Sequence, residues 1–198
     1  LLQRWVPKWY EAFSDPDLGG FYERLGHSFK PILTGQRRLI TQCRQLSIYS
    51  HATVHGCGRD LPGLRERFEF IVRMYDAPET GGMIFSVDDN GAPLDKSYDL
   101  YALSFVIFSM AHYFQASADE RACALALRIL RFIDTRFRVA GMKGFVETLG
   151  FDLIPQDKVR RHESHMHLLE ACLFAAEIFR ETAYIKMADE LVDLFLSS

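Results

Sequence analysis

Titratable side chains are densest in the segment from residue 160 to residue 171. If this segment is helical, one face places His167 between two carboxylates, with Glu163 one turn before it and Glu170 one turn after it. A neighbouring carboxylate favours the imidazolium and fixes the tautomer, as a histidine that moves protons or binds hydroxyl groups requires. The spacing leaves two interpretations open: a histidine of an active site, or a core histidine satisfied by its neighbours.

Zinc binding is the first alternative for so many histidines, and the spacing argues against it. An H-E-x-x-H motif in this segment fails because its last position is a methionine. His165 and His167 are two residues apart, so they point roughly 200° apart around a helix and cannot chelate one ion comfortably. His51 and His55 have chelating spacing, but no third ligand lies nearby in the sequence. We therefore expect no metal site and interpret this pair as structural or exposed.

Arg44 is the second candidate for chemistry. It stands one helical turn after Ile40 and one before Ile48, on an otherwise apolar face. A buried guanidinium is costly unless it is paired, so a purely structural Arg44 needs a buried carboxylate partner. The alternative is a binding site for sugar or carboxylate oxygens, which the planar fork of five donors suits well.

Tyr98 is the third candidate, at the start of a stripe of aromatic residues with helical spacing. Such a stripe is more often core than binding site. Tyr98 is a better candidate than Tyr101 because it opens the predicted helix beside a glycine-led segment.

Hydrophobic periodicity predicts the elements that must position these side chains. Seven helices are expected, at about residues 2–13, 37–52, 64–75, 96–114, 118–138, 163–179 and 182–196. Glycine corners at Gly20, Gly82 and Gly144 are 62 residues apart, which indicates one helical hairpin repeated along the chain. Each corner leads into an extended excursion, and Asn90-Gly91 predicts a hairpin turn in the second. The more aromatic helices, 37–52, 96–114 and 163–179, are expected to line the centre of an all-α toroid or solenoid.

Composition narrows the class of protein. The 198 residues are 48% hydrophobic and 25% charged with a net charge of −3, which is typical of a single globular domain spanning 1–198. No basic stripe is visible, so we expect neither a nucleic-acid nor a membrane partner. No apolar run is long enough for a signal peptide or a membrane helix. The cysteines form no C-x-x-C pair and mostly fall in helical patterns, which favours buried free thiols and a cytoplasmic location.

Three motifs, taken in order, resemble those of the N-acylglucosamine 2-epimerase family. Gln42-Cys43-Arg44, preceded by Arg37-Arg38, is similar to its arginine motif, and Lys96-Ser97-Tyr98-Asp99, followed by Phe105, is similar to its tyrosine motif. The most specific match is Met166-His167-Leu168-Leu169-Glu170-Ala171, with Trp9 and Gly19-Gly20-Phe21 also fitting. The resemblance implies an (α/α)6 barrel of six helical hairpins around a sugar pocket. This chain would supply the N-terminal three hairpins.

The resemblance also implies an activity, as a sugar 2-epimerase or an aldose–ketose isomerase. Such enzymes move the proton next to the sugar carbonyl through an enediolate, without a redox cofactor or an essential metal. Arg44 would bind substrate oxygen and stabilise developing negative charge, Tyr98 would hydrogen-bond the sugar, and His167 would bind a hydroxyl and assist proton movement. Glu163 and Glu170 are further expected contacts to a monosaccharide or its derivative.

Two departures from the family pattern matter. Glu163 stands where the family usually has asparagine, so sugar specificity at that contact is open. The two acid/base histidines of the family lie in its C-terminal half, to which nothing here corresponds. We therefore expect the chain alone to be inactive. A homodimer is possible, because an open half-ring exposes apolar edges that must be covered.

Two other functions remain alternatives. A glycoside hydrolase can share the barrel, but it needs two carboxylates flanking the scissile bond, whereas Glu163 and Glu170 share one helix. A non-catalytic α-solenoid that binds proteins would not need arginine and histidine on its inner face, and its repeats are usually shorter than this one.

Overall fold

The computed structural model describes residues 2–57, 63–141, 143–156 and 161–197. Within these ranges the seven expected helices are present, with ends that differ from the predicted ones by a few residues. They are α1 (Leu2–Phe13), α2 (Leu39–Val54), α3 (Leu64–Tyr75), α4 (Leu100–Ser117), α5 (Glu120–Arg136), α6 (His162–Phe179) and α7 (Thr182–Leu196).

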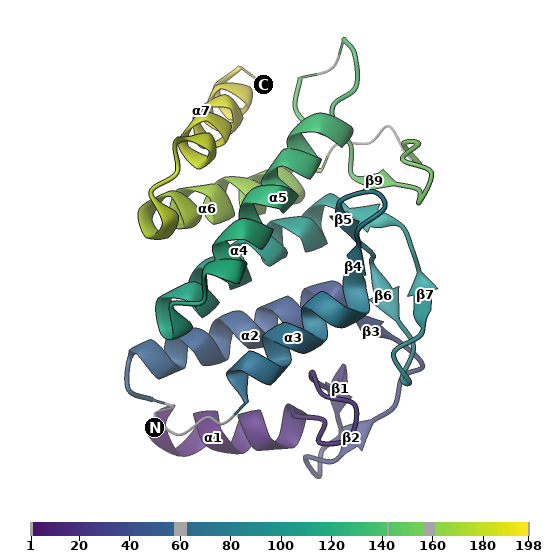
Figure 1. Cartoon of the computed structure of the whole chain (residues 1–198), viewed down its shortest axis with the longest axis vertical. Helices are drawn as coiled ribbons and strands as arrows, with labels where there is room; N and C mark the ends of the chain where they lie inside the picture. Colours follow the sequence, from purple (N-terminus) through teal and green to yellow (C-terminus); the bar gives the residue numbers. More distant parts are fainter. Residues whose placement is uncertain (1, 58–62, 142, 157–160, 198) are drawn as a thin grey trace.

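The helices form two layers (Figure 1). The inner helices α2, α4 and α6 lie side by side, and α4 packs extensively against both neighbours. The outer helices α3 and α5 cover one face of this layer, while α1 and α7 lie at its two ends. Because α4 is contacted on most sides, it is apolar nearly all round, and it supplies much of the core.

The 62-residue repeat is a repeat of backbone geometry. After each glycine corner, one N–H donates to the carbonyl at the end of the preceding outer helix, and the three bonds are equivalent. They are Tyr22 to Phe13 (2.8 Å), Ile84 to Tyr75 (2.9 Å) and Val146 to Phe137 (2.9 Å). The corner needs glycine because the chain passes close to side chains: a Cβ on Gly20 would lie 2.4 Å from the Phe70 ring.

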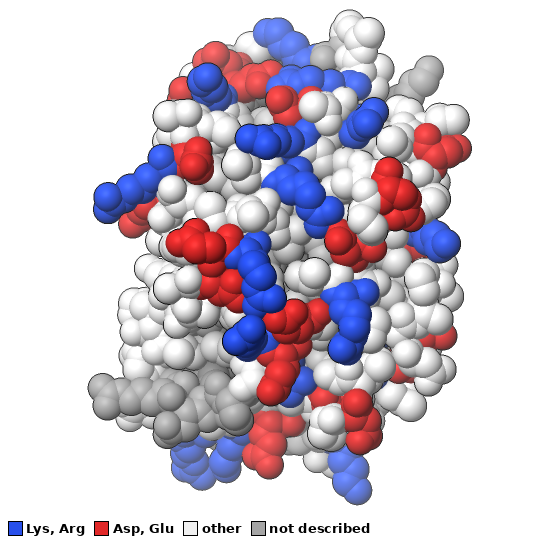
Figure 2. Space-filling view, viewed as in Figure 1, with Lys and Arg blue, Asp and Glu red and all other residues white. Residues whose placement is uncertain are grey.

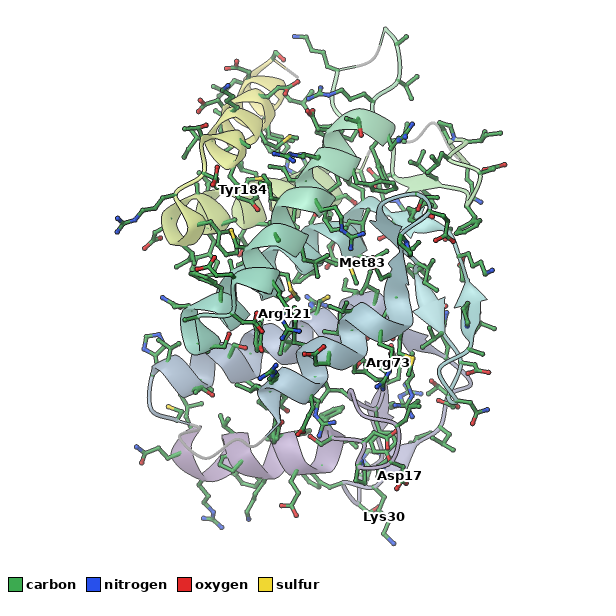
Figure 3. The ribbon with its side chains drawn as sticks, in the orientation of Figure 1. Asp17, Lys30, Arg73, Met83, Arg121 and Tyr184 are labelled. Atoms are coloured by element: carbon green, nitrogen blue, oxygen red, sulfur yellow. The ribbon has the colours of Figure 1, made fainter. Side chains whose placement is uncertain are left out.

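Short antiparallel strands gather at one end of the helices (Figure 1), and the buried Met83, labelled in Figure 3, belongs to one of them, β5 (Gly82–Met83). They are β1 (Arg24–Leu25), β2 (Pro31–Ile32), β3 (Arg37–Arg38), β4 (Asp76–Ala77), β5 (Gly82–Met83), β6 (Ser86–Val87), β7 (Pro93–Asp95), β8 (Tyr98–Asp99) and β9 (Thr148–Leu149). β6 and β7 form the hairpin predicted around Asn90-Gly91.

Strand pairing also joins consecutive repeats. β3 precedes α2 and pairs with β6 of the second excursion, and β8 precedes α4 and pairs with β9 of the third. The first residue of the inner helix follows the same rule. The N–H of Leu39 donates to Phe85 and that of Leu100 to Glu147, both at 2.9 Å. The inner helices α2 and α4 are therefore each positioned by the repeat that follows.

Carboxylates hold the starts of two inner helices. Glu23 accepts from the Arg38 N–H (3.0 Å) and the Thr41 hydroxyl (2.8 Å) at the start of α2. Glu147, two repeats later, accepts from the Arg161 N–H and the Ser164 hydroxyl at the start of α6. Both carboxylates complete helix N-termini whose backbone donors lack partners inside the helix.

Basic and acidic residues are interspersed on the face of the molecule that Figure 2 shows. Arg121 at the start of α5 pairs with Glu69 of α3 at 2.7 Å (Figure 3), and Arg138 pairs with Glu190 of α7 at 2.7 Å. Among the described residues, no helix combines the length and the apolar character needed to span a bilayer.

All four cysteines are free thiols. Cys43 and Cys172 are buried in inner helices as expected, and burial raises the pKa of each thiol to about 12. Cys123 is only half buried, so the expectation of full burial is wrong for this residue.

Candidate active site

The candidate site lies on the face of the inner layer that the outer helices leave uncovered. Counted from the first residue of each inner helix, the sixth positions are Arg44, Phe105 and His167. These three side chains meet in a row. The Arg44 guanidinium carbon lies 4.7 Å from the Phe105 ring centroid, and the His167 ring lies 5.1 Å from the same ring. The repeat thus brings an arginine and a histidine 123 residues apart in sequence to one phenylalanine.

His167 is oriented by a carboxylate. Its Nδ1 lies 3.0 Å from Oε2 of Glu170, one turn later on α6. With Nδ1–H donating to this carboxylate, Nε2 is the nitrogen left for a ligand, because it has no hydrogen-bond partner among the described residues. Glu163 is exposed and makes no described contact with His167. Of the two carboxylates expected to flank His167, only Glu170 therefore contacts it.

Arg44 is exposed, so its guanidinium is not a buried structural cation of the kind that requires a carboxylate partner. Among the described residues no carboxylate pairs with it, and its described contact is the cation–π contact with Phe105. The guanidinium therefore presents its donors to the open face. This position is suited to binding an oxygen-rich ligand.

Tyr98 does not join this group, and the sequence-based placement was wrong. The helix begins at Leu100, so Tyr98 lies in β8 and leaves the helical stripe. Its side chain is fully buried, its hydroxyl lies 2.7 Å from the Thr80 hydroxyl, and its ring packs against Phe132 of the outer helix α5. Burial raises its pKa.

Tyr101 takes the place that the sequence analysis gave to Tyr98. It is partly exposed on α4, and its ring lies 5.0 Å from His167 and 5.3 Å from Phe105. The signal was present in the sequence, because Tyr101 and Phe105 are one turn apart and Tyr98 precedes the helix cap Asp99, whose carboxylate accepts from the Ala102 N–H.

Two further basic residues of the arginine motif serve the fold. Arg37 is buried and pairs with Asp15 at 2.6 Å, which ties the first corner to β3. Arg38 pairs with Glu23 at 2.6 Å. Neither guanidinium lies in the row of Arg44, Phe105 and His167.

A second row lies two turns further along the inner helices. The thirteenth positions are His51, His112 and Phe174, with ring centroids 5.3 Å apart for the two histidines and 4.2 Å apart for His112 and Phe174. Burial, and to a lesser extent the nearby His51, lowers the pKa of His112 to about 4. His51 also lies beside His55, yet among the described residues no three side chains are placed to hold a metal ion.

His165 illustrates a structural histidine of the same segment. It is buried, its Nδ1 lies 2.9 Å from the Arg161 carbonyl, and its Nε2 accepts the Phe145 N–H at 3.0 Å. Both nitrogens are satisfied when Nδ1 carries the proton and Nε2 accepts, so this side chain holds the third glycine corner in place.

The row and its neighbours combine side chains whose chemistry is suited to binding a ligand. Phe105 and Tyr101 offer aromatic faces for C–H groups, Arg44 offers a cation with fixed donors, and His167 offers a nitrogen oriented by Glu170. Aromatic faces combined with a charged donor and an oriented acceptor nitrogen suit a polyhydroxylated ligand.

Known proteins match both the sequence and the fold. Cellobiose 2-epimerase of Bacteroides fragilis is 26% identical over 209 residues, which cover 98% of this chain and 53% of the relative. Mannose-6-phosphate isomerase of Rhizobium meliloti is 28% identical over 196 residues, which cover 96% of this chain and 48% of the relative. The chain spans about half the length of the curated relatives it matches.

The solved structure of cellobiose 2-epimerase from Bacillus thermoamylovorans B4167 aligns with a TM-score of 0.86 at 20% identity, over 95% of this chain and 51% of that one. The expected fold is confirmed: the helices correspond to half of an (α/α)6 barrel. The family described as N-acylglucosamine 2-epimerase (GlcNAc 2-epimerase) matches residues 20–198, and the chain therefore belongs to this family.

Proposed function

We propose that the protein is a sugar 2-epimerase or aldose–ketose isomerase, in which this chain forms one wall of the active site within a single barrel domain. The observation that carries the proposal is the row of Arg44, Phe105 and His167 on the uncovered face, in a chain whose family contains epimerases and isomerases. The substrate is a sugar with a carbonyl next to the carbon that loses its proton, and the four free thiols support a cytoplasmic location.

The proposed mechanism assigns one task to each group. Removal of the proton at C2 places negative charge on the carbonyl oxygen of an enediolate, and the exposed Arg44 guanidinium is suited to stabilise that charge. His167, oriented by Glu170, binds a hydroxyl through Nε2 and assists proton movement. Tyr101 and Phe105 pack against the sugar ring. Glu163 stands one turn before His167 on the open face, where it can accept from a sugar hydroxyl.

The opposite wall of the barrel must supply the remaining acid/base groups. Epimerisation returns the proton to the other face of C2 and isomerisation returns it to C1, so either reaction needs a group that faces this wall across the sugar. The single open wall described here is therefore expected to bind sugar weakly and to turn over nothing by itself.

The test is isotope exchange by the assembled protein with all six hairpins present. We expect deuterium from D2O to appear at C2 of at least one sugar among cellobiose, mannose, glucose and N-acetylglucosamine. We also expect Arg44→Ala and His167→Ala each to lower kcat/KM by at least about tenfold, the loss of one transition-state contact. Arg65→Ala is the control, because this exposed guanidinium lies on the outer helix α3.

Absence of exchange with every sugar of the panel would refute the activity. Wild-type rates in both wall variants would remove Arg44 and His167 from the site. No described contact favours a glycoside hydrolase, because Glu163 and Glu170 stand on one helix and do not face each other. A non-catalytic α-solenoid is not favoured either, because it would not need a histidine oriented by a carboxylate on its inner face.

A further inference from the structure

Outer helices dock on the glycine corners through contacts that repeat from one hairpin to the next. The middle corner (residues 76–83) forms the middle outer junction with α5, and the third corner (residues 138–141 and 143–145) forms the third outer junction with α7. A Cβ on Gly82 would lie 2.7 Å from the Phe132 ring of α5, and a Cβ on Gly144 would lie 2.9 Å from Leu194 of α7. The two contacts are equivalent, because Phe132 and Leu194 are 62 residues apart.

Apolar packing of this kind discriminates poorly between hairpins, because hydrophobic attraction is not directional. The corners share one backbone path, and each receives a bulky apolar side chain from its outer helix. α7 could therefore dock on the middle corner in place of α5 while the hairpin of α4 and α5 loops out. The entropy of closing a loop grows only slowly with its length, so little opposes the skipping of one hairpin. Misassembly between neighbouring units is a characteristic failure of repeat proteins.

An ion pair at each outer junction has the opposite polarity to its equivalent. At the middle junction the corner supplies the carboxylate, and Oδ1 of Asp76 lies 2.5 Å from Nη2 of Arg128 on α5. At the third junction the corner supplies the guanidinium, and Nη1 of Arg138 lies 2.7 Å from Oε1 of Glu190 on α7. Asp76 and Arg138 are 62 residues apart, and so are Arg128 and Glu190. The same two positions of the repeat therefore carry exchanged charges.

Exchanged charges penalise a hairpin that docks one place out of order. α7 on the middle corner would bring Glu190 beside Asp76, and α5 on the third corner would bring Arg128 beside Arg138. Both arrangements place like charges together and lose the native ion pairs. Interfaces between proteins use such repulsion to reject wrong partners.

A second outer ion pair distinguishes the two helices further. Arg121 at the start of α5 lies 2.7 Å from Glu69 of α3. The equivalent residue of α7, 62 positions later, is Ala183. α7 in the place of α5 would therefore deprive Glu69 of this cation.

We propose that the inverted ion pairs form a docking code, which directs each outer helix to its own glycine corner while the protein folds. The observation that carries the proposal is the exchange of charge between the Asp76–Arg128 pair and the Arg138–Glu190 pair. The code acts between contacts that are otherwise alike, and it does not depend on the proposed sugar activity.

Refolding of the assembled protein with all six hairpins, by dilution from urea, tests the docking code. The reversed variant, Asp76→Arg with Arg128→Glu, keeps an ion pair at the middle junction but gives it the polarity of the third, so α5 and α7 then fit either corner. We expect its misfolded fraction to rise at least about threefold, the size that partly exposed ion pairs allow. The control is Asp76→Glu with Arg128→Lys, which keeps the polarity and should refold like the wild type.

Limited digestion with trypsin identifies the error. In the native protein α5 is a packed helix, whereas a looped-out hairpin exposes its backbone to cleavage after Arg131 and Arg136. We expect the misfolded fraction of the reversed variant to be cleaved within α5 and its native fraction to stay intact. Urea unfolding of that native fraction should show wild-type stability, because the reversed pair still joins opposite charges.

Single substitutions of Glu190 approach the code from the other side. Glu190→Arg gives α7 the charge that fits Asp76 on the middle corner, whereas Glu190→Gln removes the same native pair without creating this fit. Cleavage within α5 after refolding should therefore increase for Glu190→Arg and not for Glu190→Gln. This comparison keeps the test decisive if the reversed variant does not fold.

Wild-type refolding of the reversed variant would overturn the proposal. An equal loss in its polarity-keeping control would do the same, because any change at these positions would then disturb folding. Misfolded protein that is not cleaved within α5 would place the error elsewhere, and equal cleavage of both Glu190 variants would remove the role of charge. Each readout is a folded fraction or a cleavage site, so these results are independent of the proposed function.

Discussion

The glycine corners of the first and third repeats are held differently from the corner of the middle repeat. At the fourth position of α2, the Gln42 amide bonds both backbone groups of Phe21, at 2.8 and 2.7 Å. At the same position of α6, His165 accepts from Phe145. The middle helix has the buried Leu103 there. At this helix position the middle repeat therefore has an apolar side chain where the other two repeats have one that hydrogen-bonds the corner.

The carboxylates that hold the inner helices follow the same division. Glu23 and Glu147 stand in the first and third excursions, and the equivalent middle residue is Phe85. α4 begins instead with its own capping residue, Asp99. The middle helix is covered by neighbours on both sides, so it keeps its position through apolar contacts where the flanking helices use polar ones. The conserved element of the repeat is the backbone path, and the side chains that hold it vary.

Substituting a corner glycine should lower the stability of the protein more than any of the other changes considered below. Gly20→Ala is expected to cost about 3 kcal/mol of unfolding free energy, because it adds left-handed strain and a Cβ 2.4 Å from the Phe70 ring. Gly81→Ala is the matched control, with φ of +87° and nothing within 4 Å, and should cost about 1 kcal/mol. Urea unfolding measures both. Equal losses would show that conformational strain alone selects these glycines.

The buried His112 of the middle repeat should make the stability of the protein depend on pH. The folded protein holds the pKa of His112 at about 4, below its ordinary value, so between about pH 6.5 and 4 the unfolded state binds a proton that the folded state does not. Stability should therefore fall as pH falls through this window, by at most about 3 kcal/mol. His112→Phe should flatten this dependence in urea unfolding series. An unchanged slope would assign the loss to other groups.

Replacing the carboxylates that hold the starts of α2 and α6 by amides is expected to lower stability by a smaller amount. Glu147→Gln should cost about 2 kcal/mol, because a buried anion that accepts two hydrogen bonds becomes an amide with a donor facing donors. Glu23→Gln should cost about 1 kcal/mol, since its partner Arg38 is largely exposed. Thermal or urea unfolding compares the two. A larger loss at Glu23 would contradict the role of burial.

Exchanging the two corner-holding side chains should have the smallest effect. His165→Gln places in the third repeat the residue that serves the first, and we expect a loss below about 1 kcal/mol. His165→Leu copies the middle repeat but leaves the Phe145 N–H buried without its acceptor, and about 2 kcal/mol should be lost. If both variants were equally stable, the hydrogen bond to Phe145 would contribute nothing.

The sequence allowed the repeat and the inner helices to be predicted because glycine spacing and hydrophobic periodicity report directly on backbone geometry. It also led to Arg44 and His167, since polar residues stood out on apolar stripes. Tyr98 was misplaced because its helical spacing continued a pattern beyond the true helix start at Leu100. The contacts of the excursions with the next repeat were missed, since strands of two residues leave no periodic signal. Glu147 could have been found as the equivalent of Glu23, two periods away.

The hydrogen bonds from α2 and α4 to the excursions that follow them have a consequence during synthesis. When Leu39 leaves the ribosome, its acceptor Phe85 is still unmade, so the first inner helix cannot complete its start until most of another repeat has emerged. The main contacts between helices join members of one repeat or of neighbouring repeats, so order can spread along the nascent polypeptide one repeat at a time. The nascent chain is therefore expected to become compact in steps of about one repeat. Each new excursion supplies the hydrogen-bond acceptor for the helix translated before it.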